Sequence, residues 1–204
     1  MTRSLRSLVI VTVCIAIAVA AVLLLRRFAP FPPCGVRCGA ERWMVKTLTD
    51  ETANCVNFTP KPTTVSWLVA QEPPPHLRQG SRVSDIECQV WQVTGRLIAF
   101  KLDEEDRDYH LLLADLELDS TMIVEIPDSN CADVCGSPQR IEFERARKAF
   151  SAAFGIPSGR LQRLRQPVVV TVTGVGFFDR KHNQTGVAAN GVELHPVLEF
   201  AAPP

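Results

Sequence analysis

An uncharged apolar run from Leu8 to Leu25 is the feature that most limits what this sequence can fold into. It reads LVIVTVCIAIAVAAVLLL, and as a helix it is about 27 Å long, close to the hydrocarbon thickness of a bilayer, about 30 Å. A cleaved signal peptide is the alternative, but cleavage needs small residues directly after the run, where Arg26, Arg27 and Phe28 stand. We therefore predict an uncleaved transmembrane anchor that does not contribute to a soluble core.

Two features indicate opposite orientations for this anchor. More arginines follow the run than precede it, which favours a cytoplasmic C-terminal region. The cysteines favour the other side, because an even number of dispersed cysteines is typical of disulfide-bonded domains in oxidising compartments. The cysteines after the run are Cys34, Cys38, Cys55, Cys88, Cys131 and Cys135. Giving them more weight, we expect a single-pass protein of the cell membrane whose globular domain is extracytoplasmic.

Four of these cysteines form two local pairs with the spacing Cys-x-x-x-Cys, namely Cys34 with Cys38 and Cys131 with Cys135. Four thiolates in two such pairs could hold a tetrahedral zinc ion, although the usual zinc spacing is tighter. Disulfides are the prediction and zinc is the alternative. The sequence does not choose among the disulfide pairings.

Composition divides the chain into four segments. Residues 1–27 carry the transmembrane anchor, and residues 28–40 (FAPFPPCGVRCGA) form a Pro- and Gly-rich stalk. Residues 41–81 form an arm or subdomain, and residues 82–204 form the main domain. The part that follows the anchor is long enough for one domain with a hydrophobic core.

Apolar patterning predicts five strands in the main domain. The charged turn 103–108 separates the first two strands. A helix with Ser137 as its N-cap and Pro138 in its first turn separates the third from the fourth. Gly95 interrupts the first strand as a bulge or sharp bend would, and Pro196 places the fifth at an edge or bend. The expected strands are 86–102, 109–114, 121–126, 168–178 and 192–200.

This order of elements predicts a mainly β fold. Three meandering strands with a long, bent first member, then a helix and two further strands, resemble the OB fold. That fold is a five-stranded Greek-key barrel, here with one helix between strands three and four. The transmembrane helix and a short arm would precede the barrel. Another small barrel or a sandwich is the alternative.

Two helices have recognisable boundaries. In the arm, Thr63 or Thr64 caps a short helix that runs to Ala70. In the main domain, Gly155 ends a helix whose buried face is expected to consist of Phe143, Ala146, Phe150 and Phe154.

Four stretches resemble a family of uncharacterised bacterial, largely actinobacterial, membrane-anchored envelope proteins. They are residues 41–50 (ERWMVKTLTD), 108–115 (DYHLLLAD), 121–128 (TMIVEIPD) and 174–198 (GVGFFDRKHNQTGVAANGVELHPVL). The last stretch carries the motif GVGFFDxxHxQTGVAxNGxELHPVL and is the most distinctive. The resemblance implies a bacterial, membrane-associated setting and does not imply an activity.

A polar connection, Asp179 to Gly191, joins the last two expected strands. In OB folds this connection and the turn between the first two strands lie beside the usual ligand face. Gly186 and Asn190-Gly191 let the loop fold back tightly, so a compact loop that bonds to itself is one interpretation. A recognition loop for sugar, peptide or nucleic acid is the other. Its candidate ligand-binding residues are Asp179, His182, Asn183, Gln184 and Asn190.

Three histidines form a candidate metal site: His110, His182 and His195. Zinc accepts imidazole and carboxylate ligands, and an open coordination position would make such a site hydrolytic. Asp108 and Asp179 could add oxygen ligands. No two of these histidines have the helical HExxH spacing, so hydrogen-bonded structural histidines are the alternative. Zinc is the one cofactor that any pattern here suggests.

The charged residues do not indicate a nucleic-acid function. Lys and Arg balance Asp and Glu at 22 each, so no global field attracts an anionic polymer. Two smaller groups are interpreted as solvated surface charges rather than as phosphate contacts or a nuclease centre. They are the arginines Arg160, Arg163 and Arg165 and the strand-end carboxylates Asp108, Asp115 and Glu125.

The sequence contains no G-x-S-x-G elbow, no phosphate-binding Gly-Lys loop and no dinucleotide motif. We therefore expect a non-enzymatic module, tethered to the membrane, that holds an envelope ligand or partner through the turn 103–108 and the loop 179–191. A metal-dependent hydrolase that uses His110, His182 and His195 is the alternative. A structural envelope subunit is a third interpretation.

Overall fold

The computed structural model describes residues 35–39, 41–180 and 185–203. The predicted membrane anchor and Cys34 lie outside this range. By internal contacts the chain divides into two compact units, residues 1–33 and 34–204, and the described residues all belong to the second. Within the described part, no helix is both long and apolar enough to cross a membrane.

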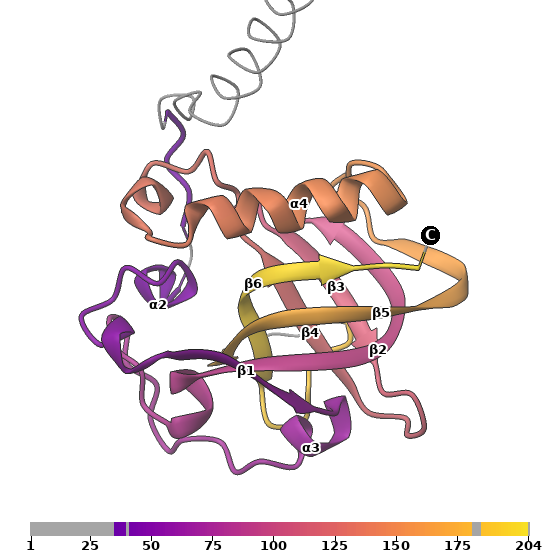
Figure 1. Cartoon of the computed structure of the whole chain (residues 1–204), viewed down its shortest axis with the longest axis horizontal. Helices are drawn as coiled ribbons and strands as arrows, with labels where there is room; N and C mark the ends of the chain where they lie inside the picture. The colour runs from indigo at the N-terminus through magenta and orange to yellow at the C-terminus, as the bar shows by residue number, and fades with distance from the viewer. Residues whose placement is uncertain (1–34, 40, 181–184, 204) are drawn as a thin grey trace, which may run out of the picture. The chain divides into compact units, whose positions relative to one another are not determined.

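The described chain is mainly β, as predicted (Figure 1). Its strands are β1 (Asn57–Thr63), β2 (Gln89–Leu102), β3 (Tyr109–Ala114), β4 (Thr121–Ile126), β5 (Gln162–Phe178) and β6 (Val192–Ala201). Its helices are α2 (Trp43–Lys46), α3 (Val65–Val69) and α4 (Arg140–Phe154), with short 3₁₀ turns η1 (Ala53–Cys55), η2 (Asp85–Cys88) and η3 (Asp133–Gly136). The expected order β-β-β-α-β-β is present as β2-β3-β4-α4-β5-β6.

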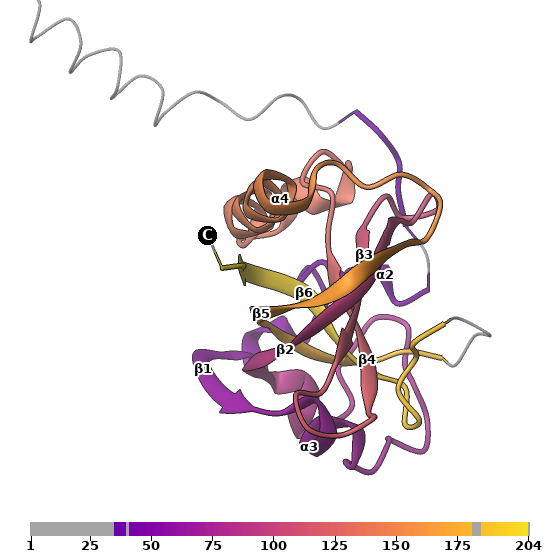
Figure 2. The same ribbon diagram turned by 90° about the vertical axis from the view of Figure 1, so that its right-hand side faces the viewer.

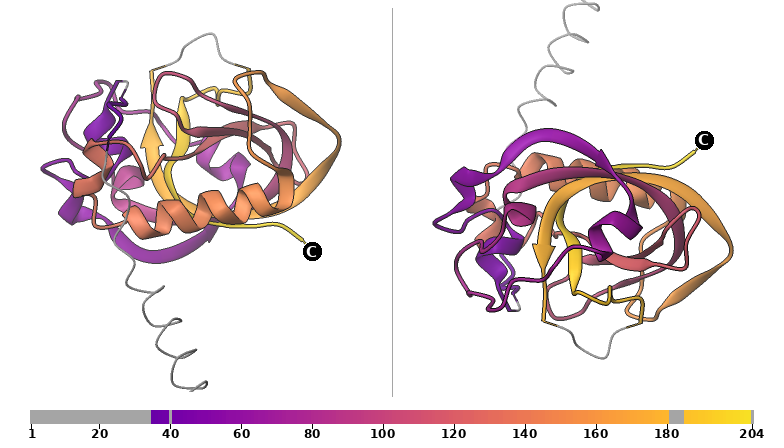
Figure 3. Two further views of the ribbon diagram at one scale, coloured as in Figure 1. Left: turned by 90° about the horizontal axis from the view of Figure 1, so that it is seen from above. Right: turned by 90° about the horizontal axis from the view of Figure 1, so that it is seen from below.

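The six strands form one mixed sheet in the order β1-β2-β3-β4-β6-β5. β2 also pairs with β5, so the strands β2, β3, β4, β6 and β5 close into a ring that β1 borders from outside. The β1–β2 and β4–β6 pairs are parallel and the other pairs are antiparallel. Views from above and below show how strongly the strands curve (Figure 3).

Gly95 lies where β2 changes its neighbour. β1 pairs with β2 up to Val93, and β3 pairs with it from Arg96 onward. A Cβ atom at Gly95 would come within 2.7 Å of the Ala114 carbonyl oxygen, so the close approach of β3 requires glycine. The register shift itself falls beyond Arg96, between Leu97 and Ala99, so Gly95 marks the contact rather than the bulge.

The main core fills the inside of the ring. Alternate residues of β2, β3, β4, β5 and β6 point inward, because successive side chains of a strand face opposite sides. Phe150 of α4 closes one end of this core, and Leu68 of α3 packs into the same core from the opposite end (Figures 1 and 2). A smaller cluster that includes Phe143, Val90 and Val175 lies outside the ring under α4 and the arm.

Most of the predicted helix features are found. Phe143, Ala146 and Phe150 are buried on one face of α4, and Gly155 follows its last residue. The predicted N-cap Ser137 instead accepts a hydrogen bond from the Gln139 backbone N–H, and α4 begins at residue 140. In the arm, the predicted cap at residue 64 is confirmed, since the Thr64 hydroxyl accepts from the Trp67 N–H at the start of α3.

Strand β1 was not predicted from the sequence. It reads NFTPKPT and is exposed along almost its whole length, so it shows no alternation of apolar and polar residues. Pro60 and Pro62 also remove two backbone donors, which is tolerated only in an edge strand. Residues 57–63 therefore form a strand because they pair with β2, and not because of their local strand propensity.

Disulfides connect the arm to the main domain. Cys38 pairs with Cys131 and Cys55 pairs with Cys88, with Cα–Cα distances of 5.5 and 5.3 Å. Cys135 is also disulfide-bonded. The disulfide prediction is confirmed for these residues, and the zinc alternative at the cysteines is wrong for them because a disulfide sulfur has no thiolate to offer a metal. The first two bridges lie on either side of residues 41–54 and hold this part of the arm against the ring.

Candidate functional site

Charged side chains project from the outer face of the ring. Tyr109 and Leu111 point into the core, so His110 between them points outward, and Glu125 of β4 does so for the same reason. On β6, Glu193 and His195 share this outer face. All four side chains are nevertheless buried, because residues of the arm cover them.

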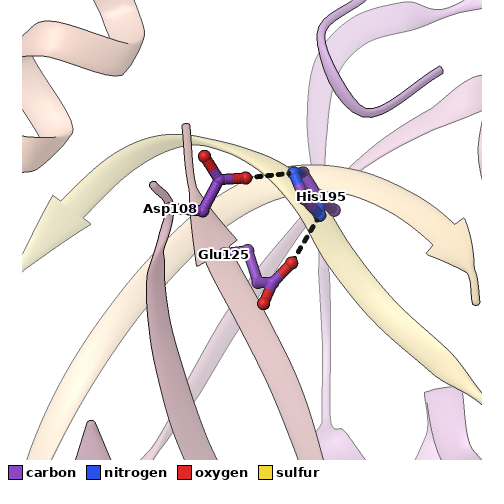
Figure 4. A group of neighbouring side chains, drawn as sticks. All are labelled: Asp108, Glu125 and His195. Carbon is purple, nitrogen blue, oxygen red and sulfur yellow. Dashed lines mark ion pairs between the residues drawn. The ribbon is translucent and has the colours of Figure 1, made fainter. Parts of the chain in front are cut away.

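His195 lies between two carboxylates (Figure 4). Its Nε2 atom is 3.0 Å from Asp108 Oδ2, and its Nδ1 atom is 2.9 Å from Glu125 Oε2. Both contacts are ion pairs in which the oxygens lie off the N–H directions. Burial alone would lower the pKa of His195, but the two carboxylates outweigh it and raise the pKa to about 9. His195 is therefore an imidazolium at neutral pH.

Glu125 connects the two histidines. Its Oε1 atom accepts a hydrogen bond from His110 Nδ1 at 2.6 Å, while its Oε2 atom faces His195. Burial would raise the pKa of Glu125, but the hydrogen bond from His110 and the ion pair with His195 hold it well below the usual value. The carboxylate is therefore ionised although it is almost completely enclosed.

Lys46, on the short helix α2, supplies the second cation. Its Nζ atom lies 3.5 Å from Asp106, 3.8 Å from Glu125 and 3.7 Å from Asp179. Burial would lower the pKa of Lys46, but the surrounding carboxylates raise it above the ordinary lysine value. The ammonium also lies over the Phe177 ring, 5.7 Å from its centre, in a cation–π contact.

Carboxylates outnumber cations in this group, which we call the buried ionic cluster. It consists of Lys46, Asp106, Asp108, His110, Glu125, Asp179, Glu193 and His195. Burial and the neighbouring carboxylates raise the pKa of Glu193 well above its usual value, which favours the protonated acid. The same causes raise the pKa of Asp106 to about 7. Protons on these two acids reduce the excess negative charge.

A second set of buried ion pairs fixes the arm beside the cluster. Arg42 Nη1 is 2.6 Å from Glu87 Oε1 and also donates to the Phe178 carbonyl oxygen at 2.6 Å. Arg82 Nη2 is 3.0 Å from Asp50 Oδ1. Other donors of the two guanidiniums bond to backbone carbonyl oxygens. Arg82 Nε is the exception, since it has no hydrogen-bond partner among the described residues.

Three members of the cluster, Asp108, Glu125 and His195, offer possible metal-ligand atoms within 4.8 Å of one another. An imidazolium has no free lone pair, so His195 must lose its proton before it can bind a metal. The group is almost completely enclosed, since the exposed fractions of Asp108 and His195 are 0% and that of Glu125 is 6%. As described, the arrangement neutralises charge and attaches the arm to the ring.

The structure brings together part of the predicted metal site. His110 and His195 meet at Glu125, while His182 lies outside the described residues, as do the ligand candidates Asn183 and Gln184. Asp179 joins the buried ionic cluster. Asn190 has an internal role: its Nδ2 atom donates to the carbonyl oxygens of residues 68 and 71, each at 2.9 Å.

The interpretation of the strand-end carboxylates as solvated charges was wrong. Asp108, Asp115 and Glu125 are all buried, because the arm and α3 pack over the ends of β3 and β4. Sequence reasoning also missed Lys46 and Glu193. The available signal for Glu193 was the presence of one or two buried-type acids or histidines inside an otherwise apolar strand, as in YHLLLA, TMIVEI and VELHPV.

Two open hollows lie away from the buried ionic cluster. One is a groove of about 550 Å³ between β1 and α4, lined in part by Phe58, Arg145 and Phe200. The other has a volume of about 430 Å³ and lies beside η2 and α3. We call it the Trp67 pocket; its lining residues are Lys61, Trp67, Asp85, Ile86, Cys88, Gln89 and Trp91.

Comparison with solved structures finds a likeness to a crystal structure described as that of an aspartyl-tRNA synthetase from Leishmania major Friedlin. The TM-score is 0.38 and the sequence identity is 11%, values at which a likeness carries no information on function. The match covers 72% of this chain and 21% of the other, so this chain spans about a fifth of that protein's length. No family model and no curated protein matches the chain.

Proposed function

We propose that the chain is a non-enzymatic binding module of the bacterial cell envelope, tethered to the membrane by its N-terminal helix and built on an OB-like barrel. The strand circuit supports the barrel assignment. Its order β2-β3-β4-β6-β5, closed by the β2–β5 pair and with α4 inserted between the third and fourth strands, matches the five-stranded Greek-key pattern.

The observation that carries the non-enzymatic assignment is the burial of the buried ionic cluster. A catalytic group must touch its substrate, yet the arm packs over Asp108, Glu125 and His195, whose exposed fractions are 0%, 6% and 0%. The arm is held in place by the Cys38–Cys131 and Cys55–Cys88 bridges on either side. The cluster therefore stabilises the ligand-binding scaffold, and ligand contact takes place on open surfaces.

The disulfides also support an extracytoplasmic position for the domain, because structural disulfides persist in oxidising compartments. A tether on that side restricts the module to a shell next to the membrane and raises its local concentration there. On intact cells, a membrane-impermeant maleimide should label the chain only after treatment with an impermeant reductant. Labelling that requires lysis of the cells would place the domain in the cytoplasm.

Binding is tested with the full-length chain in lipid nanodiscs. The chain is incubated with cell-wall sacculi from an actinobacterium and, separately, with purified envelope proteins and lipids from the same source. Saturable binding to one of these fractions, competed by excess unlabelled chain, is expected. Non-saturable binding to every fraction, equal to that of empty nanodiscs, overturns the proposal.

A metal-dependent hydrolase is the second candidate. It is favoured because both His110 and His195 contact Glu125, and because Asp108, Glu125 and His195 hold possible ligand atoms close together. It requires a metal to replace the proton of His195 and access for a substrate past Lys46. Metal analysis of the full-length chain, purified without chelator, tests it. Stoichiometric zinc that is lost in Glu125→Gln, together with metal-dependent hydrolysis, would make the hydrolase the better assignment.

A further inference from the structure

We propose that the Trp67 pocket binds a saccharide, with the indole ring of Trp67 as the stacking surface. This inference rests on the proposed binding function and names the class of its ligand. The ligand would bind away from the loop 179–191 that the sequence indicated. Asn190 of that loop would instead help to position the helix that carries Trp67.

The pocket contains an exposed aromatic surface. Trp67 is 44% exposed, and its ring packs against that of Trp91, with the ring centroids 5.1 Å apart. Trp91 is itself fixed, since its Nε1 atom donates to the Ile86 carbonyl oxygen at 3.0 Å. An indole that is supported from behind and open in front presents a flat apolar face to a ligand.

A local cap and contacts from two distant residues hold the helix that carries Trp67. Thr64 accepts from the Trp67 backbone N–H, and Asp115 Oδ2 accepts from the Ser66 backbone N–H at 2.8 Å. Asn190 Nδ2 donates to the carbonyl oxygens of Leu68, in α3, and of Gln71, just after α3. Because α3 is too short to be stable alone, these contacts position the ring before any ligand arrives.

The opposite wall of the pocket is also rigid. The Cys55–Cys88 bridge ties the end of η2 to the arm. Gly176 of β5 lets the Ile86 backbone approach closely, since a Cβ atom there would come within 2.2 Å of the Ile86 carbonyl oxygen. The Gln89 amide donates to carbonyl oxygens of residues 57 and 59 and so fixes β1 at the pocket.

Two charged side chains of the pocket are free to meet a ligand. Lys61 of β1 and Asp85 of η2 are both exposed, and within the described part of the chain neither makes a hydrogen bond or an ion pair. Together they provide a strong donor and a strong acceptor beside the Trp67 ring.

This combination selects a ligand class. A cationic ligand would be attracted by Asp85 but repelled by Lys61. An anionic ligand such as a nucleic-acid phosphate would be attracted by Lys61 but repelled by Asp85. A neutral saccharide fits both, because its hydroxyl groups accept from an ammonium and donate to a carboxylate. One face of a pyranose ring carries mainly C–H groups, which pack on an indole, so all three side chains are used.

The experiment measures binding of soluble tetrasaccharides to the full-length chain in nanodiscs by calorimetry and tryptophan fluorescence. Chitotetraose, maltotetraose and mannotetraose are the probes, and choline and tripolyphosphate are the cationic and anionic comparisons. At least one tetrasaccharide is expected to bind with saturation and to outcompete both ions. Preferential binding of choline or of tripolyphosphate overturns the saccharide assignment.

Variants locate the site. Trp67→Ala should lower the affinity about tenfold or more, whereas Trp67→Tyr, which keeps a flat ring, should retain most of it. Lys61→Ala and Asp85→Ala should each weaken binding, and because these side chains have no internal partners the variants are expected to fold normally. Phe58→Ala is the matched control: Phe58 is 43% exposed, lies on the same strand as Lys61 and faces the other hollow.

The failure of this inference is distinguishable from failure of the proposed function. If no tetrasaccharide binds, and saturable envelope binding persists unchanged in Trp67→Ala, the saccharide pocket is wrong and the binding module stands. If Phe58→Ala abolishes tetrasaccharide binding while Trp67→Ala does not, the pocket is also wrong. If neither saccharides nor any envelope fraction bind, both proposals fail.

Discussion

Arg42 and Glu87 form a fully enclosed ion pair, with Nη1 2.6 Å from Oε1 and side-chain exposures of 1% and 0%. Arg42 belongs to the arm, whereas Glu87 lies in η2, directly before the first strand of the ring. Glu87 also accepts from the backbone N–H of Phe178, at the end of β5. One buried pair therefore joins the arm, η2 and the end of β5.

Removing one partner of this pair should be costly. Arg42→Met leaves Glu87 buried without its cation, and we expect the free energy of unfolding to fall by about 3–5 kcal/mol. Urea unfolding measures the loss. Arg145→Met is the control, since Arg145 is exposed and its carboxylate partner lies 4.0 Å away, so its effect should stay below about 1 kcal/mol. A loss in Arg42→Met no larger than in the control would contradict the role given to the pair.

Lys46 should be equally important to the buried ionic cluster. Lys46→Met keeps the length of the side chain but removes the cation that faces Asp106, Glu125 and Asp179. We expect a loss of about 3–5 kcal/mol at neutral pH, which becomes smaller as the pH falls and the carboxylates take up protons. The solvent-exposed Lys148 gives the matched control, Lys148→Met. A loss that does not depend on pH would show that packing, rather than charge, explains the effect.

Stability should decline toward alkaline pH because of His195. Its folded-state pKa of about 9 lies above the ordinary value of 6.5, so its contribution is fully present below about pH 6.5 and is lost as the pH rises through about 9. The contribution is about 3 kcal/mol at most. Asp106 also makes stability decline as the pH rises. Its pKa is raised from 3.8 to about 7 in the folded state, so its contribution is lost as the pH rises through about 7.

The measurement is the free energy of urea unfolding from pH 6 to pH 10. His195→Gln should flatten the alkaline part of the profile, and the exposed His76 provides the control variant His76→Gln. A wild-type profile that is level across this range would mean that His195 is not protonated in the folded state.

Opening the Cys55–Cys88 bridge should destabilise the domain. The double substitution of both residues by alanine is expected to lower the free energy of unfolding by about 2–4 kcal/mol, because the bridge constrains the unfolded chain. Thermal unfolding of the variant, compared with the wild type under oxidising conditions, measures this loss. Equal melting temperatures would show that the bridge does not hold the arm.

Local patterns predicted much of the ring. The short apolar runs at residues 109–114 and 121–126 correspond to β3 and β4 at the same boundaries, because strands that are buried on both faces are apolar along their whole length. The face of α4 that contains Phe143 and Phe150 follows from helical periodicity in the same way. β1 shows no such pattern, so its existence depends on pairing with β2 alone.

The candidate site was less predictable. Sequence patterns identified His110, His195 and Asp179 as chemically distinctive. They gave Asp108 both as a possible metal ligand and, with Glu125, as a solvated charge. Burial of those carboxylates depends on the arm. The sequences of β3 and β4 contain no sign that a helix from far upstream covers these strands. Lys46 was not singled out for the same reason, since it precedes its partner Asp179 by most of the domain.

The sequence by itself determined the number and order of the ring strands, the position of α4 and the presence of disulfide-forming cysteines, because these follow from periodicity and composition over short windows. Only the tertiary structure decided which cysteines pair and which charges are sealed from water. The pairing of Cys38 with Cys131, and the bond from Arg42 to the Phe178 carbonyl oxygen 136 residues away, arise from packing the arm on the ring. Such contacts depend on the whole folded chain, and no local propensity encodes them.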